Sequence, residues 1–156
     1  MTQYLFDHTL TNESKITVVG CTEEGIAKLQ KKYSHLTIQH LNPSMGFINQ
    51  ADEVNNLIEQ LKQYNAEYIF LAVGSPQQEV FAAQLKQSGL TGVALCIGAS
   101  INFLVGVEYR APKWMQVLHL EWFYRMTQDP KRLVKRYTMN AVYLPKILWY
   151  LRKAYR

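Results

Sequence analysis

The segment that decides the fold is residues 68–79, which read Tyr-Ile-Phe-Leu-Ala-Val-Gly-Ser-Pro-Gln-Gln-Glu. The first six residues are almost continuously apolar, which is typical of a central parallel strand that helices cover on both faces. Gly74 then ends the strand, and Pro76 suits the first position of a helix that we expect to run to about residue 88. The segment therefore predicts a buried strand, a tight turn and a helix in direct succession.

The same alternation of strand and helix continues on both sides of this segment. Further strands are predicted at residues 15–20, 36–41 and 93–97, and further helices at residues 22–33 and 50–64. Thr22 suits the N-cap of the first of these helices. After Arg110 the pattern indicates helices only. The alternation predicts an α/β fold with a Rossmann-like, three-layer parallel sheet and right-handed crossovers, followed by a helical, basic C-terminal appendage.

The charges are divided unevenly along the chain. Residues 1–109 carry six lysines, no arginine and ten acidic residues, a net charge of −4. Residues 110–156 carry eleven basic and two acidic residues, a net charge of +9. Such a division indicates a globular body and a basic appendage whose partner is anionic, for which nucleic acid, anionic lipid and a nucleotide diphosphate all qualify.

We therefore expect three parts: an N-terminal tail at residues 1–14, a Rossmann-like domain at residues 15–112 and a helical appendage at residues 113–156. The longest apolar region, residues 93–107, is interrupted by glycine and polar residues and is shorter than the roughly 20 residues of a spanning helix. A soluble or peripheral protein is expected, and no signal peptide is recognised.

Cysteines and histidines show no spacing that would bind a metal. Cys21 and Cys96 each end an apolar run, and we expect both to be small buried residues in a reducing cytoplasm. The four histidines are scattered. The sequence therefore predicts neither a metal site nor a cofactor.

The turn after the central strand is the first candidate site. A helix N-terminus attracts phosphate, and Gly74 would allow a ligand to approach the backbone. Ser75 and Gln78 also have the spacing of a capping box, and with Pro76 at the first helical position this explains them without a ligand. It does not explain Glu79, which follows Gln78 at the edge of the sheet where α/β proteins bind ligands.

A second candidate is Asn102, which lies among apolar neighbours between Gly98 and Pro112. Its amide would either satisfy backbone groups in a tight loop or bind a base or sugar, and the spacing favours neither. The turn between Gly20 and Gly25 is expected to be a plain strand-to-helix turn, because its two carboxylates would repel phosphate.

The last part of the chain is predicted to be a basic amphipathic helix. Asp129 and Pro130 form a strong helix start. The cationic side chains share one stripe of this helix, at Lys131, Arg132, Lys135 and Arg136. Beyond residue 145, tyrosine and tryptophan alternate with lysine and arginine, as in helices that lie at a membrane surface. The alternative is an ordinary solvated face, although few acidic residues are present to balance the basic ones.

At this point the sequence resembles the WecG/TagA/CpsF family of bacterial glycosyltransferases. The resemblance covers roughly residues 15–137. The matching positions are Gly74, Pro76, Gln78, Glu79, Gly98, Phe103, Gly106, Arg110, Ala111, Pro112, Glu121, Trp122, Tyr124, Arg125, Pro130, Arg132, Arg136 and Tyr137. Two earlier strand-end loops, at residues 19–21 and 43–46, also resemble the family's.

The resemblance implies an inverting, metal-independent transferase that moves a hexose such as N-acetylmannosamine from a UDP donor. The acceptor would be an undecaprenyl-diphosphate-linked saccharide at the inner face of the bacterial plasma membrane, in the synthesis of teichoic acid or capsule. It also implies a basic appendage that closes over the active site and touches the membrane. The implied nucleotide-sugar site comprises Gly74, Pro76, Gln78, Glu79, Gly98, Asn102 and Arg110. The residues implied to contact the diphosphate or the membrane are Arg125, Arg132, Lys135 and Arg136.

The sequence departs from the family at two points. Asn102 stands where the family usually has aspartate. The family's presumed catalytic aspartate belongs to an N-terminal half that precedes the matching region, so the catalytic residue and the activity of this chain remain open. The alternative to a transferase is a non-catalytic remnant or membrane-docking subunit, with a second copy or a separate N-terminal half as partner. A nucleic-acid-binding module is disfavoured because residues 1–109 are net acidic.

Overall fold

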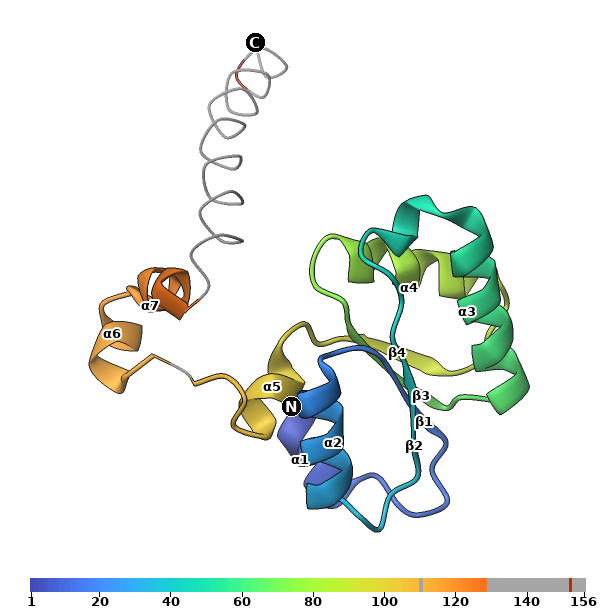
Figure 1. Ribbon diagram of the computed structural model, residues 1–156, viewed down its shortest axis with the longest axis horizontal. Helices are drawn as coiled ribbons and strands as arrows, with labels where there is room; N and C mark the ends of the chain where they lie inside the picture. The colour runs from blue at the N-terminus through green and yellow to red at the C-terminus, as the bar shows by residue number, and fades with distance from the viewer. Residues whose placement is uncertain (110, 129–151, 153–156) are drawn as a thin grey trace. The chain divides into compact units, whose positions relative to one another are not determined.

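The computed structural model describes residues 1–109, 111–128 and 152. The chain divides into two compact units, Met1–Tyr109 and Arg110–Arg156. Each unit is described by itself below (Figure 1).

The first unit is built on a parallel sheet. Its strands are β1 (Ile16–Gly20), β2 (Ile38–Leu41), β3 (Tyr68–Ala72) and β4 (Val93–Cys96). They lie in the order β2-β1-β3-β4, and every neighbouring pair is parallel. The predicted α/β fold is confirmed. The strand order reverses direction between β1 and β3, which makes the carboxyl ends of these two strands a topological switch point.

Helices cover both faces of the sheet (Figure 1). On one face, side chains of α1 (Thr2–His8), α2 (Glu23–Lys32) and α5 (Ser100–Leu104) share a core with Val18 and Phe70. On the other face, α3 (Ala51–Tyr64), α4 (Gln77–Gln87) and the short 3₁₀ helix η1 (Phe47–Asn49) share a core with Val19 and Leu71. The alternation of β1 and β3 residues between the two cores gives the predicted three layers.

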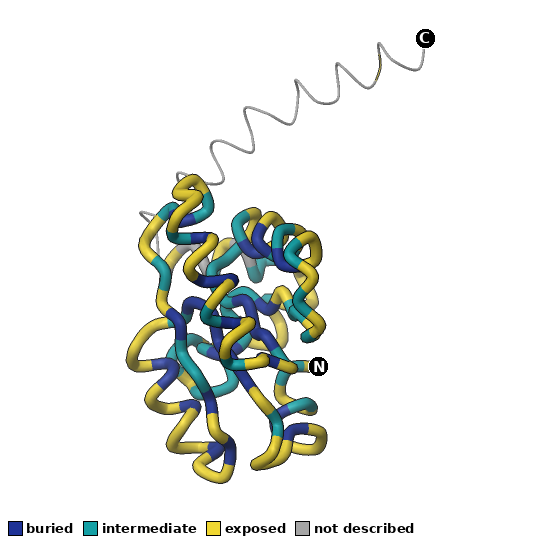
Figure 2. The backbone as a smooth tube through the Cα atoms, turned by 90° about the vertical axis from the view of Figure 1, so that its right-hand side faces the viewer, coloured by how far each residue is buried: buried dark blue, intermediate teal, exposed yellow. Residues whose placement is uncertain are grey.

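The apolar run of the central strands explains their position in the sheet. All five residues of β1 are buried, and Thr17 is tolerated because its hydroxyl donates to Gln39 Oε1 at 2.8 Å. Figure 2 shows the buried strands between exposed outer helix faces. At the start of α2, the Thr22 hydroxyl accepts the Gly25 N–H at 3.1 Å, which confirms the predicted cap.

The N-terminus differs from the prediction of a tail at residues 1–14. Residues Thr2–His8 form α1, whose Phe6 is buried with its ring centroid 5.0 Å from that of Phe70 and 5.1 Å from that of Tyr33. The Tyr33 hydroxyl donates to Asp7 Oδ1 at 2.6 Å. The helix is held by these long-range contacts, for which the local sequence has no signal.

The second unit contains two described helices, α6 (Lys113–Val117) and α7 (Glu121–Gln128). The Gln116 amide donates to the Ala111 carbonyl at 2.6 Å, at the start of α6. The predicted basic helix from residue 130 lies outside the described residues. Within the part of the chain that the structure describes, no helix has the length and hydropathy needed to span a membrane.

Candidate functional site

Three loops leave the carboxyl ends of β1, β3 and β4 at one edge of the sheet. A glycine in the left-handed region lies at each of these strand ends: Gly20 at φ 85°, Gly74 at φ 82° and Gly98 at φ 52°. A side chain is disfavoured in this conformation, so the glycines suit these sharp turns. Since β1 and β3 flank the switch point, the loops border the place where open α/β sheets bind ligands.

The glycines differ in what surrounds them. A Cβ atom on Gly20 would lie 2.7 Å from Val73 Cγ1, so the turn after β1 packs directly on the end of β3. A Cβ atom on Gly74 would meet nothing within 4 Å. Gly20 is therefore required for packing, whereas Gly74 faces open space that a ligand can enter.

Gln78 connects the turn after β3 to the turn after β4. Its side chain is almost fully buried; Oε1 accepts the Gly98 N–H at 3.0 Å, and Nε2 donates to Glu79 Oε1 at 2.9 Å. Both ends of the amide are thus used, and the Gln78 side chain links the Gly98 N–H to the Glu79 carboxylate.

The predicted capping box of Ser75 and Gln78 is wrong. Helix α4 begins at Gln77, with Pro76 immediately before it and no side-chain cap. The peptide bond between Ser75 and Pro76 is cis. The capping box fails because the Gln78 amide turns toward Gly98 and Glu79 instead of reaching back to the helix start.

Asn102, on α5, joins the turn after β1 to the loop after α5. The Cys21 thiol donates to Asn102 Oδ1 at 3.3 Å, and Asn102 Nδ2 donates to Glu108 Oε1 at 2.9 Å. The backbone carbonyl of Asn102 also accepts the N–H groups of Val107 and Glu108 at 2.8 and 3.1 Å. We call this arrangement of Cys21, Asn102 and Glu108 the amide clasp.

The amide clasp gives a physical reason for asparagine at position 102. An asparagine amide accepts from the thiol and donates to the carboxylate at the same time. An ionised aspartate could only accept, and it would repel Glu108. Gly25 lies against the clasp, since a Cβ atom there would stand 2.7 Å from Cys21 Sγ and 2.8 Å from Asn102 Oδ1.

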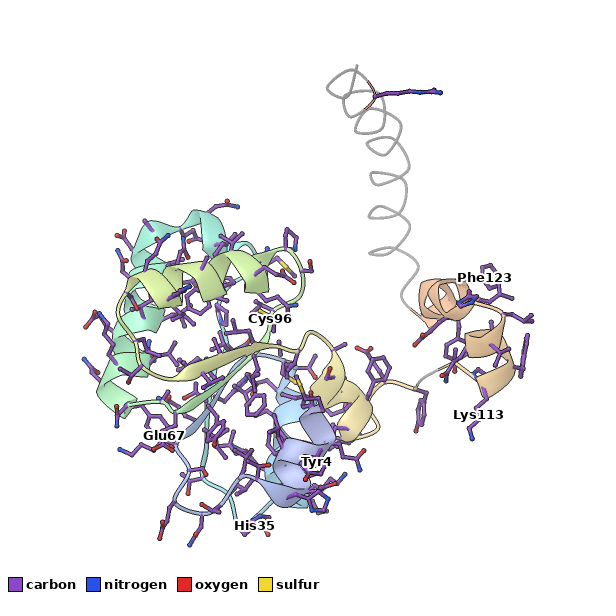
Figure 3. All side chains as sticks on the ribbon, turned by 180° about the vertical axis from the view of Figure 1, so that it is seen from behind. Tyr4, His35, Glu67, Cys96, Lys113 and Phe123 are labelled. Atoms are coloured by element: carbon purple, nitrogen blue, oxygen red, sulfur yellow. The ribbon has the colours of Figure 1, made fainter. Side chains whose placement is uncertain are left out.

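The cysteines are less buried than the sequence suggested. Cys21 is half-buried and adopts φ 75°, whereas Cys96 is exposed, so the prediction of two buried cysteines is wrong. Burial raises the pKa of both thiols, and the charges of Glu108 and Glu79 add to the effect at Cys21 and Cys96 respectively. The charged thiolate form is therefore disfavoured at both residues. Figure 3 labels Cys96 at the end of β4.

Sequence reasoning missed a polar group at the ends of β1 and β2. His40 Nε2 lies 2.9 Å from the Gly20 carbonyl oxygen, a contact that requires the proton on Nε2. Its Nδ1 lies 3.9 Å from Glu23 Oε1, which also accepts the Asn42 amide at 3.2 Å. The available signal was the position of His40 and Asn42 at the end of one strand and of Glu23 after the neighbouring one, because parallel strands end at the same edge.

The loop after β2 is fixed to α3 by one carboxylate. Glu53 Oε1 accepts the Ser44 N–H at 2.6 Å, and Oε2 accepts the Ser44 hydroxyl at 2.6 Å. These two bonds lower the pKa of Glu53, with the hydroxyl bond the larger cause.

The remaining candidate residues belong to the second unit. Arg125 lies in α7. Arg110, Arg132, Lys135 and Arg136 lie outside the described residues. Among the residues that are described, no group of three or more His, Cys, Asp or Glu side chains is arranged to hold a metal ion.

The sequence was also compared with known proteins. The model of the glycosyl transferase WecG/TagA/CpsF family matches residues 1–156. Three relatives, from Staphylococcus aureus strains MW2, NCTC 8325 / PS 47 and MRSA252, are named N-acetylglucosaminyldiphosphoundecaprenol N-acetyl-beta-D-mannosaminyltransferase. Each is 29% identical over 126 residues, which cover 78% of this chain and 48% of the relative. The chain thus spans about half the length of these curated relatives. Because the family model matches along the whole chain, the protein belongs to the WecG/TagA/CpsF family of glycosyl transferases.

Proposed function

We propose that this chain is the nucleotide-sugar-binding part of a transferase that moves a hexose from a UDP donor to an undecaprenyl-diphosphate-linked saccharide. N-acetylmannosamine is the proposed sugar because the relatives' names specify an N-acetylmannosaminyl group and this acceptor class. The observation that carries the proposal is the Gln78–Gly98 bond beside the open face of Gly74, at the switch point of a family member's sheet.

The proposed roles follow from the chemistry of the turn. The start of α4 offers backbone N–H groups and the positive end of the helix dipole to the donor diphosphate. Gln78 holds the turns after β3 and β4 in fixed relation, and Pro76 and Glu79 complete the wall of the turn. Asn102 acts on the other side of the switch point through the amide clasp, and Arg110 is proposed to lie near the donor.

Positive charge is needed where the diphosphate leaves, because negative charge develops there during transfer. Arg125, Arg132, Lys135 and Arg136 are the proposed source of that charge, or of contacts with anionic lipid. Their place in the net positive residues 110–156 supports a peripheral position on the inner face of the bacterial plasma membrane. The proposed location is cytoplasmic.

Calorimetric titration tests the binding role. UDP, UMP and uridine are added in turn to the native chain and to Gln78→Ala, with Gln63→Ala, an exposed residue of α3, as the control. We expect UDP to bind more tightly than UMP, and Gln78→Ala to weaken UDP binding while the control variant retains it. Absence of heat with UDP, or equal affinity for all three ligands, contradicts a diphosphate site.

A transfer assay separates the enzyme from the alternative. The purified chain is supplied with UDP-N-acetylmannosamine and a lipid-linked N-acetylglucosamine acceptor, and product is followed by mass spectrometry. The chain spans only about half the length of its curated relatives, so we expect slow transfer or none by this chain alone. General-base assistance typically raises the rate of a reaction about 10²–10⁴-fold. UDP binding without transfer supports the non-catalytic alternative, and rapid transfer would place the base within this chain.

A further inference from the structure

Three polar side chains meet at the carboxyl ends of β1 and β2, beside the switch point. His40 belongs to β2, Asn42 follows that strand, and Glu23 begins α2 after β1. Glu23 Oε1 accepts the Asn42 amide at 3.2 Å and lies 3.9 Å from His40 Nδ1. We call this group of His40, Asn42 and Glu23 the acceptor cluster.

The contact between His40 and Gly20 determines what the other side of the imidazole can do. His40 Nε2 lies 2.9 Å from the Gly20 carbonyl oxygen, so this nitrogen carries a proton. In the neutral ring Nδ1 is then an acceptor, and it faces the Glu23 carboxylate, which also only accepts. Two acceptors 3.9 Å apart do not bond to each other. The cluster therefore lacks a donor that a bound group can supply.

The two facing side chains differ in their exposure. The His40 side chain is only 14% exposed, so little water reaches Nδ1, whereas the Glu23 side chain is 77% exposed. Within the residues that the structure describes, Glu23 Oε2 has no hydrogen-bond partner. The carboxylate thus forms the open side of the acceptor cluster, and the imidazole forms its inner side.

The chemistry of the acceptor cluster selects the group that fits it. A phosphate would be repelled by the Glu23 carboxylate. A divalent cation needs more ligands than one carboxylate and one imidazole, and the described ranges hold no group of three or more His, Cys, Asp or Glu side chains that could bind one. Two neighbouring hydroxyl groups supply two uncharged O–H donors, one for His40 Nδ1 and one for Glu23. A vicinal diol is therefore the group that the cluster fits.

We propose that the acceptor cluster binds the ribose of the UDP donor through its 2′- and 3′-hydroxyl groups, an inference that rests on the proposed function. The cluster lies between the ends of β1 and β2, and the turn at Gly74 follows β3 on the other side of β1. Neighbouring strands are about 4.8 Å apart, so less than about 10 Å separates the two places. Ribose and diphosphate are adjacent parts of one nucleotide, so a single donor can occupy both.

This assignment gives the turn after β1 a role that phosphate binding does not. The turn was expected to be a plain strand-to-helix turn, because its carboxylates would repel phosphate. The same negative charge strengthens hydrogen bonds from hydroxyl donors. Glu24 forms an ion pair with Lys28 at 2.7 Å. Glu23, which contacts His40 and Asn42, is therefore the carboxylate assigned to the ribose.

Calorimetric titration with UDP, 2′-deoxy-UDP and 3′-deoxy-UDP tests the ribose contact. The native chain should bind each deoxy nucleotide about three- to tenfold more weakly than UDP, because each lacks one hydrogen bond. Glu23→Ala should bring the preference for one hydroxyl group below about twofold, and His40→Gln should do so for the other. Glu24→Ala, in the same helical turn, is the matched control and should keep both preferences.

The design separates recognition of the ribose from local structure. In His40→Gln the new amide can still donate to the Gly20 carbonyl, so the turn after β1 keeps this bond while the Nδ1 acceptor is lost. Each preference is a ratio of two affinities measured on the same variant. A general loss of stability or of diphosphate binding weakens both ligands alike and leaves the ratio unchanged.

Each contrary outcome has a distinct meaning. If the native chain binds UDP and both deoxy nucleotides equally, the ribose assignment is wrong and the proposed function stands. Preferences that persist in both Glu23→Ala and His40→Gln also overturn the assignment. Absence of UDP binding contradicts the proposed function and this inference with it. If Glu23→Ala weakens binding of UDP-N-acetylmannosamine but leaves the preferences among the three nucleotides unchanged, the bound diol belongs to the hexose, which overturns the assignment to ribose.

Discussion

The side-chain oxygen of Gln78 accepts the backbone N–H of Gly98 at 3.0 Å, across 20 residues of sequence. The bond ties the first turn of α4 to the turn after β4, so the turns after β3 and β4 are joined directly. Any group bound at the open face of Gly74 would therefore meet a wall that is already in place, which lowers the entropy lost on binding.

Replacing Gln78 should lower stability as well as ligand affinity. Gln78→Ala leaves the half-buried Gly98 N–H with only its longer bond to the Leu71 carbonyl oxygen, at 3.3 Å, and should cost about 0.5–1.5 kcal/mol in the free energy of unfolding. Gln78→Glu keeps an acceptor for the Gly98 N–H but places a second carboxylate next to Glu79. The loss of stability in this variant should therefore shrink as the pH falls. Urea unfolding at pH 7 and pH 4.5 measures both effects. Equal stability of Gln78→Ala and the native chain would show that the Leu71 carbonyl oxygen alone satisfies the Gly98 N–H.

The amide clasp should not tolerate aspartate. Asn102→Asp loses the donor to Glu108 and sets two carboxylates together, so we expect a loss of about 1–2 kcal/mol at pH 7. The reversed pair, N102D/E108Q, supplies an amide donor to the new carboxylate and should recover most of that loss. Chemical denaturation of the two single variants and the double variant gives the coupling. Additive effects would mean that residues 102 and 108 act independently.

Gly25→Ala should destabilise α2 although alanine is the better helix former. Helix propensity favours the change by about 1 kcal/mol. The new methyl would stand within 3 Å of Cys21 Sγ and Asn102 Oδ1, and such overpacking costs about 1–3 kcal/mol. Thermal unfolding should show a net decrease. Ala27→Gly, further along the same helix, is the matched control for helix propensity alone. If Gly25→Ala is more stable than the native chain, Cys21 and Asn102 move aside at little cost.

The contact between Tyr33 and Asp7 should appear in the pH dependence of stability. The Tyr33 hydroxyl lowers the pKa of Asp7 below 3.8, so this stabilisation is present above that pH and is lost as the pH falls through the lowered value. Burial raises the pKa of Tyr33 above 10.0, so stability should also fall as the pH rises past 10. Tyr33→Phe should flatten both limbs of a plot of melting temperature against pH. If Tyr33→Phe leaves the fall in melting temperature at low pH unchanged, that fall is caused by other carboxylates, such as Glu53.

Membrane binding should depend on the basic residues of the appendage. The double variant R132Q/K135Q removes two charges worth about 1 kcal/mol each near an anionic surface, a loss of roughly 30-fold in partition. Sedimentation with phosphatidylglycerol vesicles at low salt measures it. The control variant K31Q/K62Q removes the same charge from the first unit. Equal losses in both variants would indicate a response to net charge alone.

The elements that sequence reasoning predicted well are those with a local signal. The apolar run of β3 and the cap at Thr22 depend on neighbours within a few residues, and both are seen in the structure. Local signals misled where a distant partner competes. Ser75 and Gln78 have the spacing of a capping box, but Gln78 binds Gly98 instead.

The sequence pointed to individual residues of the candidate site. It did not predict the hydrogen bonds that connect them. Asn102 was singled out, yet its partner Cys21 is 81 residues away in the sequence. The burial of Phe6 likewise depends on Phe70, which no pattern near residue 6 indicates. Such contacts arise from the order of strands in the sheet, so they become visible only when the fold is known.

Helix α1 also sets the boundary at which the first unit can be cut or joined. A shorter version that starts at β1 would strip Phe6 from Phe70 and Tyr33 and leave two aromatic rings facing water, with aggregation as the expected result. Met1, which is 82% exposed, points away from that contact. A preceding polypeptide or a purification tag can therefore be fused at Met1 without disturbing the aromatic packing, whereas the first ten residues are indispensable to the fold.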